Sequence, residues 1–528
     1  MSVPKSVICI CSGIRLHNRY EHSIHFDGPD AQLAYFAGKV VKTLPAYSYL
    51  RKSWPLKVEA TMEEAKTWSY LYFQNSPSGK YYFYFINTVE YVNDSTVELG
   101  LELDVIQTYY FDYQELPCFV ERQHTLSDDL GQHTVDEGLD VGEYIVGGQE
   151  ALPLNECCIM VMSTYDPEYT TESNTRQFVG GLTDGCFTGL CISAVKYSDW
   201  EALGTKIQAL DSAGKSDGII SMWMYPKNMI RLDDGESWQD DKTFHLVNSV
   251  EPMFTETARP DKLDGYTPKN KKLLSYPYSF LYATNNLGEA ATFRYERFGD
   301  PSACILRTVG AVGAGGGLRT YALNYNGEQH AYENGLSLTN WPTCAWNQDI
   351  YKMWLAQNQN QNGLAMLTGA AKVVGGIATA FATGGLGSAA GAGAVLSGAA
   401  DIAGQLAQRA DRAIQPPEAK GTASASVNVA CTFQTIDVKQ KTITAEYAKI
   451  IDNYFTMYGY KINRVQEPKR AARIGYTYVK TVGCHVVGDL CHEDIAKIES
   501  IYDHGITFWR DGDTIGDYTQ ENAAASDG

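Results

Sequence analysis

The stretch from residue 373 to residue 400 constrains this chain most, because it contains no charged residue although 20% of the whole sequence is charged. It reads VVGGIATAFATGGLGSAAGAGAVLSGAA, so its apolar character comes mainly from Ala and Gly. A membrane-spanning helix needs about 20 predominantly apolar residues, and this stretch is long enough. Each glycine costs a helix interior about 1 kcal/mol relative to alanine, so one copy alone would insert weakly. Small residues let backbones approach closely, which favours several copies packed together.

A flexible Gly/Ala-rich loop or a buried core helix would have the same composition, so the residues alone leave these interpretations open beside a conditional membrane or lumen segment. The flanks favour helices: apolar residues in the range 347–362 fall on one helical face, and Ile402 and Leu406 have helical spacing before Pro416. The larger apolar residues that would contact lipid or neighbouring copies are Val373, Val374, Ile377, Phe381, Leu386, Val395, Leu396 and Ile402.

Length and charge bound the class of protein. A chain of 528 residues is too long for one compact core, so we expect several domains. The formal charge of -19 argues against a protein that grips nucleic acid, because phosphate neutralisation needs clustered Lys and Arg. The same charge is compatible with a protein past which DNA slides without sticking. The beginning of the sequence lacks the pattern of a signal peptide, so we expect synthesis and assembly in a cytoplasm.

We expect most cysteine and tyrosine side chains to pack in the protein core or at interfaces. The 12 cysteines follow neither a disulfide framework nor a zinc-ribbon spacing, so we expect them to be reduced and mostly buried. The 35 tyrosines suit strands and interfaces, where the ring is packed and the hydroxyl stays in water.

Strand patterns dominate the chain. Residues 81–105 predict a hairpin with one wet face, because apolar and polar residues alternate after a turn at Asn93-Asp94. A short amphipathic helix is expected over residues 493–503, ended by Gly505. The fold should therefore be mainly β, with minor helices and several domains. Further strands are expected at residues 159–163, 219–225, 291–297, 427–435 and 477–482.

Motifs for chemistry are weak throughout. The glycine-rich residues 309–319 lack the Lys and Ser/Thr of a phosphate loop, so a hairpin or subunit-facing loop is favoured. Cys484-His485 and Cys491-His492 alternate on strands, so their side chains would not converge on zinc. No catalytic residue, metal ligand or cofactor is predicted.

Two polar clusters are read as ordinary surface. His17, His22, His25 and Asp27 lack the helical pairing of a metallohydrolase motif, so surface histidines are expected. A basic run is more typical of a solvated or subunit-contact face than of a DNA contact. The run comprises Lys461, Arg464, Lys469, Arg470 and Arg473.

Three segments carry a resemblance to a known family. Residues 104–125, residues 136–142 (DEGLDVG) and residues 458–522 resemble the tail knob, or distal tail tube, proteins of small phi29-like podoviruses. The apolar segment lies between the second and third, where that family carries its long hydrophobic loop. The residues taken to carry the resemblance are Asp104, Gln107, Thr108, Phe111, Tyr458, Gly459, Tyr460, Asn463, Gly505 and Trp509.

The resemblance implies a virion protein that is made in the host cytoplasm and forms a hexameric tube of β-barrel or sandwich domains at the far end of a short noncontractile tail. Its implied partners are copies of itself, the collar or proximal tube, the tail-tip protein, the host cell membrane and phage DNA passing through without specific binding. The expected divisions are a tube part at 1–151, a knob or insertion domain at 152–265, a second tube part at 266–362, the apolar loop at 363–421 and a C-terminal tube part at 422–528.

The resemblance further implies that apolar loops plug the lumen before infection and then insert into the host membrane as a pore for genome ejection. One alternative is a tail-tip protein that binds a receptor or degrades the cell wall, which would need a carbohydrate groove or a hydrolytic site. A bacterial pore-forming toxin is a third interpretation, against which the lack of a secretion signal and the tail-protein motifs count.

Overall fold

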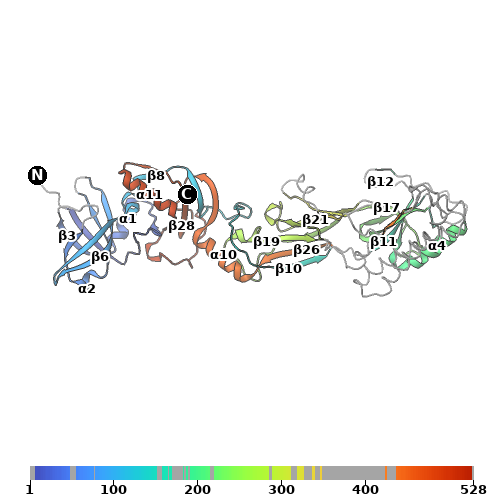
Figure 1. Cartoon of the computed structure of the whole chain (residues 1–528), viewed down its shortest axis with the longest axis horizontal. Helices are drawn as coiled ribbons and strands as arrows, with labels where there is room; N and C mark the ends of the chain where they lie inside the picture. The colour runs from blue at the N-terminus through green and yellow to red at the C-terminus, as the bar shows by residue number, and fades with distance from the viewer. Residues whose placement is uncertain are drawn as a thin grey trace, which may run out of the picture. The chain divides into compact units, whose positions relative to one another are not determined.

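The chain divides into two compact units in the computed structural model. Unit 1 comprises Met1–Glu143, Lys262–Tyr278 and Ile443–Gly528, and unit 2 comprises Tyr144–Asp261 and Ser279–Thr442. Blue and red elements lie together in unit 1 because its segments come from both ends of the chain (Figure 1). The structure describes residues 6–47, 55–75, 78–151, 157–163, 166–168, 182–183, 186–187, 191–213, 219–284, 288–310, 318–325, 336–338, 345–347, 422–424 and 436–525.

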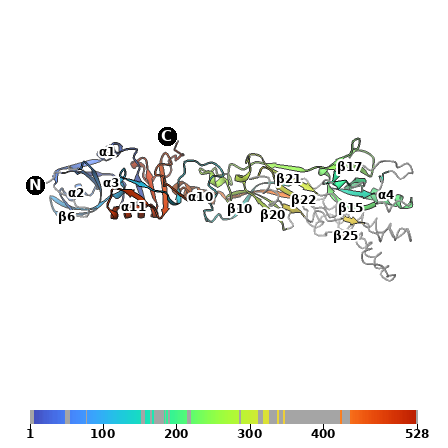
Figure 2. The same ribbon diagram turned by 90° about the horizontal axis from the view of Figure 1, so that it is seen from above.

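The first sheet of unit 1 is antiparallel and six-stranded, and its strands curve around a common interior (Figure 2). The strands at its two edges, which contain Lys42 and Glu59, approach each other: Lys42 Nζ donates a hydrogen bond to the backbone carbonyl of Glu59 at 2.7 Å. Inside, the rings of Phe36 and Tyr70 stack with centroids 5.1 Å apart. In spatial order the strands are β3 (Val40–Tyr47), β1 (Ser6–Ser12), β5 (Trp68–Gln74), β6 (Tyr81–Asn93), β7 (Thr96–Leu103) and β4 (Leu56–Glu59).

A second sheet of unit 1 joins distant parts of the sequence. β2 (His22–Ile24) pairs in parallel with β30 (Ile506–Trp509). The other neighbouring strands pair antiparallel. The spatial order continues from β30 through β28 (Tyr476–Val482), β9 (Cys118–Gln123) and β27 (Tyr460–Gln466). β8 (Tyr113–Glu115) and β29 (Val486–Gly488) form a separate two-stranded antiparallel sheet.

The helices of unit 1 have clear starting and ending signals. α10 (Ala445–Tyr458) begins after Thr444, whose hydroxyl accepts a bond from Tyr447 N–H, and ends at Gly459. α11 (His492–His504) packs on β28 and ends at Gly505. The shorter helices are α1 (Pro29–Ala37), α2 (Met62–Ala65) and α3 (Val105–Tyr109), with the 3-10 turns η4 (Lys271–Leu274) and η7 (Gly512–Thr514).

Unit 2 is built on a seven-stranded antiparallel sheet with α4 (Trp200–Ser212) packed on it. Ile159, Leu203 and Trp223 belong to its buried core. In spatial order the strands are β16 (Ile230–Leu232), β17 (His245–Val250), β14 (Cys191–Lys196), β11 (Cys157–Ser163), β15 (Ile219–Pro226), β24 (Ala345–Asn347) and β25 (Thr422–Ser424).

Two smaller four-stranded sheets share the same core cluster of unit 2. The first consists of β10 (Tyr144–Ala151), β26 (Asp437–Ile443), β19 (Ser279–Thr284) and β20 (Ala290–Phe293). The second consists of β18 (Met253–Thr257), β21 (Cys304–Gly310), β22 (Leu318–Ala322) and β23 (Leu336–Leu338). The remaining elements are the pair β12 (Leu182–Thr183) and β13 (Cys186–Phe187), and the 3-10 turns η1 (Tyr197–Asp199), η3 (Lys227–Met229) and η5 (Tyr295–Arg297).

The mainly β, multidomain fold expected from the sequence is confirmed. The hairpin at 81–105 is present as β6 and β7, and the inward residues of β7 are buried. Its predicted end was wrong, because Val105 begins α3, where the Asp104 carboxylate caps the helix. The strand expected at 291–297 ends at Phe293, and Tyr295–Arg297 form a 3-10 turn.

The remaining predicted elements divide into two groups. Those at 159–163, 219–225, 477–482 and 493–503 are confirmed as β11, β15, β28 and α11. The strand expected at 427–435, the helical flanks of the apolar segment and most of that segment's surroundings lie outside the described residues. The expected domain boundaries stay a prediction.

Candidate functional site

The apolar segment lies outside the described residues, but the structure describes both of its attachments. β24 and β25 pair antiparallel, with Ala345 opposite Ser424 and Asn347 opposite Thr422. β24 also pairs with β15, so β25 forms the edge of the seven-stranded sheet. Asn347 and Thr422, the described residues on either side of 348–421, therefore lie opposite each other in neighbouring strands. The site residues Val373, Val374, Ile377, Phe381, Leu386, Val395, Leu396 and Ile402 all lie within this range, outside the described part.

The first group of motif residues builds a buried polar network around α3. The Asp104 carboxylate accepts a hydrogen bond from Gln107 N–H at 3.1 Å and one from Tyr70 Oη at 2.7 Å. Burial raises the pKa of Asp104 to about 6, and these two hydrogen bonds oppose the shift. The Tyr70 hydroxyl is thus buried and paired, which corrects the expectation that tyrosine hydroxyls stay in water.

Gln107 and Thr108 connect α3 to two other segments. Gln107 Nε2 donates to Ser23 Oγ at 3.0 Å and to the Ile24 carbonyl at 2.9 Å, which fixes β2. Thr108 Oγ1 accepts from Phe83 N–H at 3.0 Å, which fixes β6. Buried polar groups are stable only when they are paired, so this network specifies one arrangement of the two sheets of unit 1.

Two further motif residues have different surroundings. The Trp509 side chain is fully buried, and its Nε1–H donates to His22 Nδ1 at 3.3 Å. His25 Nδ1 lies 2.5 Å from Tyr110 Oη. His22 and His25 are therefore half-buried in the packing of unit 1, whereas His17 and Asp27 are exposed, as expected of a polar surface. Phe111 is 43% exposed and contacts Tyr110 edge to face.

The second group of motif residues controls the backbone after α10. Gly459 has φ +63°, and a Cβ built there would lie 2.4 Å from the carbonyl of Gln123. Asn463 has φ +50° at a β-bulge in β27, a conformation that Asn tolerates better than most residues. Gly505 has φ +96° and closes α11 against Tyr478. Tyr458 packs edge to face on Tyr478 as well.

The DEGLDVG motif places Glu137 at the centre of a buried ionic network. Its carboxylate pairs with Arg122 Nη2 and with Lys272 Nζ, and its side chain is 1% exposed. Lys461 N–H donates to Glu137 Oε1 at 3.0 Å. Burial lowers the pKa of Lys272, and the Glu137 carboxylate opposes that shift. One carboxylate thus ties all three chain segments of unit 1 together.

A second buried carboxylate makes the same kind of connection without belonging to the motif set. Asp452, in α10, accepts hydrogen bonds from Tyr266 Oη at 2.7 Å, Lys269 N–H at 2.7 Å and Asn270 N–H at 3.0 Å. The motif residue Tyr460 donates through its hydroxyl to Asp128 nearby. The segment Lys262–Tyr278 is therefore held to α10 by these polar contacts, which sequence reasoning missed, and by a shared hydrophobic cluster.

The basic run does not form one solvated face. Arg470 donates to both oxygens of Glu115, through Nε at 2.5 Å and Nη2 at 2.7 Å. Arg473 is buried. Lys461, Arg464 and Lys469 instead line a groove of about 420 Å³ beside β27. The predicted solvated or subunit-contact face is therefore wrong for Arg470 and Arg473.

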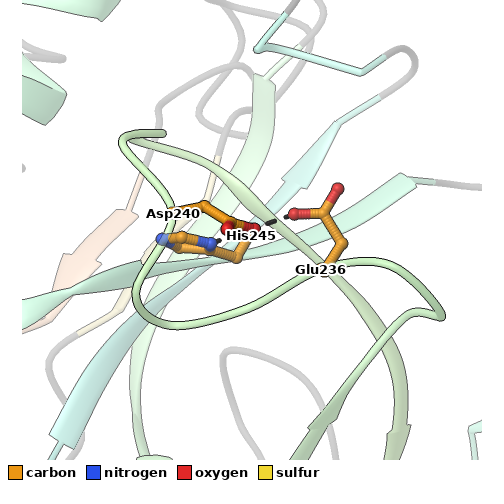
Figure 3. A group of neighbouring side chains, drawn as sticks. All are labelled: Glu236, Asp240 and His245. Carbon is orange, nitrogen blue, oxygen red and sulfur yellow. Dashed lines mark ion pairs between the residues drawn. The ribbon is translucent and has the colours of Figure 1, made fainter.

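Ligands for a metal ion converge at one place among the described residues. Glu236, Asp240 and His245 bring one ligand atom each within 4.8 Å of one another (Figure 3). Cys484 is buried, while His485 pairs with Glu499 at the surface and Cys491 is exposed, so that cysteine and histidine set stays apart. In the described part of the chain, no helix is long and apolar enough to cross a membrane.

Comparisons with known proteins show which class of protein this chain belongs to. Residues 4–114 match the model of the caudoviral major tail protein N-terminus, and residues 243–523 match that of the C-terminal domain of the Bacillus phage phi29 tail knob protein gp9. The tail knob proteins gp9 of Bacillus phages B103 and phi29 are each 26% identical, over 97% of this chain and 98% of theirs. The tail knob protein gp12 of bacteriophage C1 has the same fold, with a TM-score of 0.65 and 13% identity over 98% of this chain and 100% of that one.

The fold and these matches define a structural component of a phage tail, located in the virion. The chain belongs to the family of the phi29 tail knob protein gp9. Its known relatives are structural tail knob proteins that assemble within a phage tail. The resemblance seen in the sequence is thereby confirmed.

Proposed function

We propose that this protein forms, as a homohexamer, the distal tube and knob of a short phage tail. The apolar loop at 363–421, which contains the uncharged stretch 373–400, plugs the lumen of that tube. On infection this loop leaves the lumen and inserts into the host membrane as a pore for the genome. The collar or proximal tube and the tail-tip protein are its partners in the virion. The observation that carries the proposal is the attachment of the segment to paired edge strands of unit 2.

This attachment suits a movable segment because both ends are held by one pair of strands. β24 and β25 are hydrogen-bonded to each other, so the segment between them can change position without breaking the sheet at its base. A long connection between two adjacent strands can change without altering the packing of the rest of the fold. Once in a bilayer, the backbone groups of the six copies must be satisfied internally as helices or a closed barrel.

An apolar stripe on the second sheet of unit 1 supports assembly with further copies. Val465 in β27 lies opposite Phe119 in β9, and Phe119 lies opposite Val482 in β28. Directly opposed residues share a face of the sheet, so the three side chains form a row. They are 71%, 38% and 55% exposed. We assign this row to the contact between neighbouring copies in the ring.

The charge of the chain supports passage of DNA through the tube. With 62 acidic and 43 basic residues, a tube of six copies is strongly negative. A negative wall repels phosphate and keeps DNA from binding as it moves.

The test replaces residues 363–421 with a short Gly/Ser linker in the phage genome. Because Asn347 lies opposite Thr422, the retained residues 348–362 and the linker have only to join two adjacent strand ends, so we expect the protein to fold and enter virions. Adsorption should stay normal while genome delivery and membrane depolarisation of the host are lost. Normal genome delivery by these virions would contradict the pore.

A paired set of substitutions separates membrane insertion from assembly. Ile377→Asp with Phe381→Asp adds two charges, each of which costs about 2.5–3.5 kcal/mol at the centre of a membrane helix. Ile377→Leu with Phe381→Leu is the matched control, because it keeps the segment apolar. The charged pair should block delivery and the leucine pair should not. Equal delivery by both would refute the insertion of this segment.

A further inference from the structure

The connection between β16 and β17 in unit 2 gathers three groups that suit a metal ion. Glu236 and Asp240 lie in this loop, and His245 is the first residue of β17 (Figure 3). His245 is held in place by the sheet, where it lies opposite Ala194 of β14. The three side chains point toward one another, with one ligand atom from each within 4.8 Å of the others.

His245 distinguishes this group from an ordinary acidic cluster. Its side chain is 0% exposed, and neither ring nitrogen has a hydrogen-bond partner among the residues that the structure describes. Nδ1 faces Glu236 Oε2 at 3.9 Å, a separation too long for a hydrogen bond. Leaving a buried polar group unpaired costs about 1–3 kcal/mol, so a ligand bound to the imidazole nitrogen at this position would be stabilising.

The spacing suits a small cation. Zn²⁺ lies about 2.0–2.2 Å from nitrogen and carboxylate ligands and its sites are tetrahedral, so two ligand atoms of one ion are about 3.4 Å apart. The 3.9 Å between His245 Nδ1 and Glu236 Oε2 is only about 0.5 Å longer than this distance. All three ligand atoms lie within 4.8 Å of one another, so a movement of at most about 1.5 Å would close the group around one ion, and the loop residue Asp240 can supply it.

The neighbouring charges set the expected strength. Lys242 Nζ donates to Glu236 Oε1 at 3.0 Å, while Glu236 Oε2 faces the histidine. Lys196 also acts on His245 electrostatically. These two cations offset part of the negative charge of Glu236 and Asp240, so binding should be weaker than at a site made of cysteines alone.

We propose that Glu236, Asp240 and His245 bind one divalent transition-metal cation of the class of Zn²⁺ or Mn²⁺, which fastens the loop at 233–244 to β17. One imidazole with two carboxylates favours these ions over Ca²⁺ and Mg²⁺, whose preferred ligands are all oxygen. The site is structural, because it joins a loop to a sheet. It is independent of the pore proposal, since none of its ligands belongs to the apolar segment.

The test measures Zn²⁺ binding to the purified full-length protein after removal of metals with a chelator. Calorimetry should give one Zn²⁺ per chain that Asp240→Asn and His245→Gln both lose. Asp241→Asn removes the same charge from the adjacent, exposed residue and should keep the ion. Because His245 is buried and its variant could unfold, Asp240→Asn decides the question by itself. Equal Zn²⁺ binding by Asp240→Asn and Asp241→Asn, or no binding to the wild type, would overturn the proposal.

A second readout follows the loop directly. The Trp238 ring packs against His245 with centroids 5.3 Å apart. Addition of Zn²⁺ or Mn²⁺ should therefore change tryptophan fluorescence in the wild type and in Asp241→Asn, and Trp238→Phe should abolish that change. Ca²⁺ at the same concentration should leave it unaltered. A fluorescence change that persists in Trp238→Phe would place the ion elsewhere and count against this site.

Discussion

At the scale of single residues, unit 1 depends on buried polar groups that are fully paired. Glu137 and Asp452 each accept several hydrogen bonds from residues far away in the sequence, and Asp104 accepts one from Tyr70 and one from Gln107. Such groups are costly when a partner is missing and stabilise one arrangement when all partners are present. The family motifs therefore preserve the architecture of the unit, and we find in them no set of groups arranged for a reaction among the described residues.

Glu137 gives the sharpest test of this view. Glu137→Gln should lower the free energy of unfolding by about 3–5 kcal/mol, because it leaves Arg122 and Lys272 buried without a counter-charge. Glu143→Gln, at an exposed position, is the control and should change stability by less than about 0.5 kcal/mol. Urea unfolding of the two variants measures both values. Similar stabilities would contradict a central role for Glu137.

His124 predicts a pH dependence of stability. Burial, with Arg473 nearby, lowers the pKa of His124 to about 3, from about 6.5 in the unfolded chain. Between these values the unfolded state binds more protons, so this contribution is complete above pH 6.5 and is lost as pH falls toward 3. The slope is at most about 1.4 kcal/mol per pH unit.

The measurement compares unfolding of wild type and His124→Gln between pH 7 and pH 4. We expect the variant to have a shallower loss of stability, because its side chain cannot take up a proton. His485→Gln, at an exposed position, is the control and should follow the wild type. Parallel curves for wild type and His124→Gln would show that His124 does not titrate as proposed.

At the scale of elements, the sequence predicted what depends on local pattern. The alternation of apolar and polar residues in β7 and the helical spacing of apolar residues in α11 indicate those elements from the sequence alone. The helix α10 is not among the predicted elements, although Thr444 and Gly459 provide its cap and its stop. The sequence also offered no sign that Lys262–Tyr278 returns to unit 1, since that depends on long-range contacts such as those of Asp452.

Gly459 provides a test at this scale. Gly459→Ala should destabilise unit 1 more than Gly483→Ala, because both have positive φ but only Gly459 has the backbone of Gln123 in the way of a Cβ. Gly483→Ala should cost about 1 kcal/mol for its conformation alone. Thermal unfolding of both variants gives the comparison. Equal losses would mean that the close approach at Gly459 relaxes freely.

The functional residues were predictable only in part, because the sequence shows local patterns but not contacts between distant residues. The absence of charge identifies residues 373–400 from the sequence alone, because a segment that enters a membrane must be predominantly apolar whatever structure it adopts. The group of Glu236, Asp240 and His245 has no recognisable spacing, and its signal is a buried imidazole without a partner, which only coordinates reveal. A loop with two acids followed by a histidine at the start of a strand is too common to be a motif.

At the scale of the whole molecule, the apolar row on unit 1 predicts assembly. Val465→Asp should weaken the ring, because it places a charge in the proposed contact beside Phe119. Gln466→Asp, at the neighbouring position in β27, adds the same single negative charge and is the control. Analytical ultracentrifugation over a range of concentrations should show smaller species for Val465→Asp only. Loss of assembly in both variants would mean that charge, and not the apolar row, sets the contact.

The proposed function depends on six copies that surround a channel closed by their apolar segments. Electron cryomicroscopy of the purified full-length protein, beside the variant in which a linker replaces residues 363–421, measures this directly. We predict sixfold rings in both samples, with density filling the channel of the wild type and an open channel in the variant. A monomer, or a wild-type ring with an empty channel, would contradict the account.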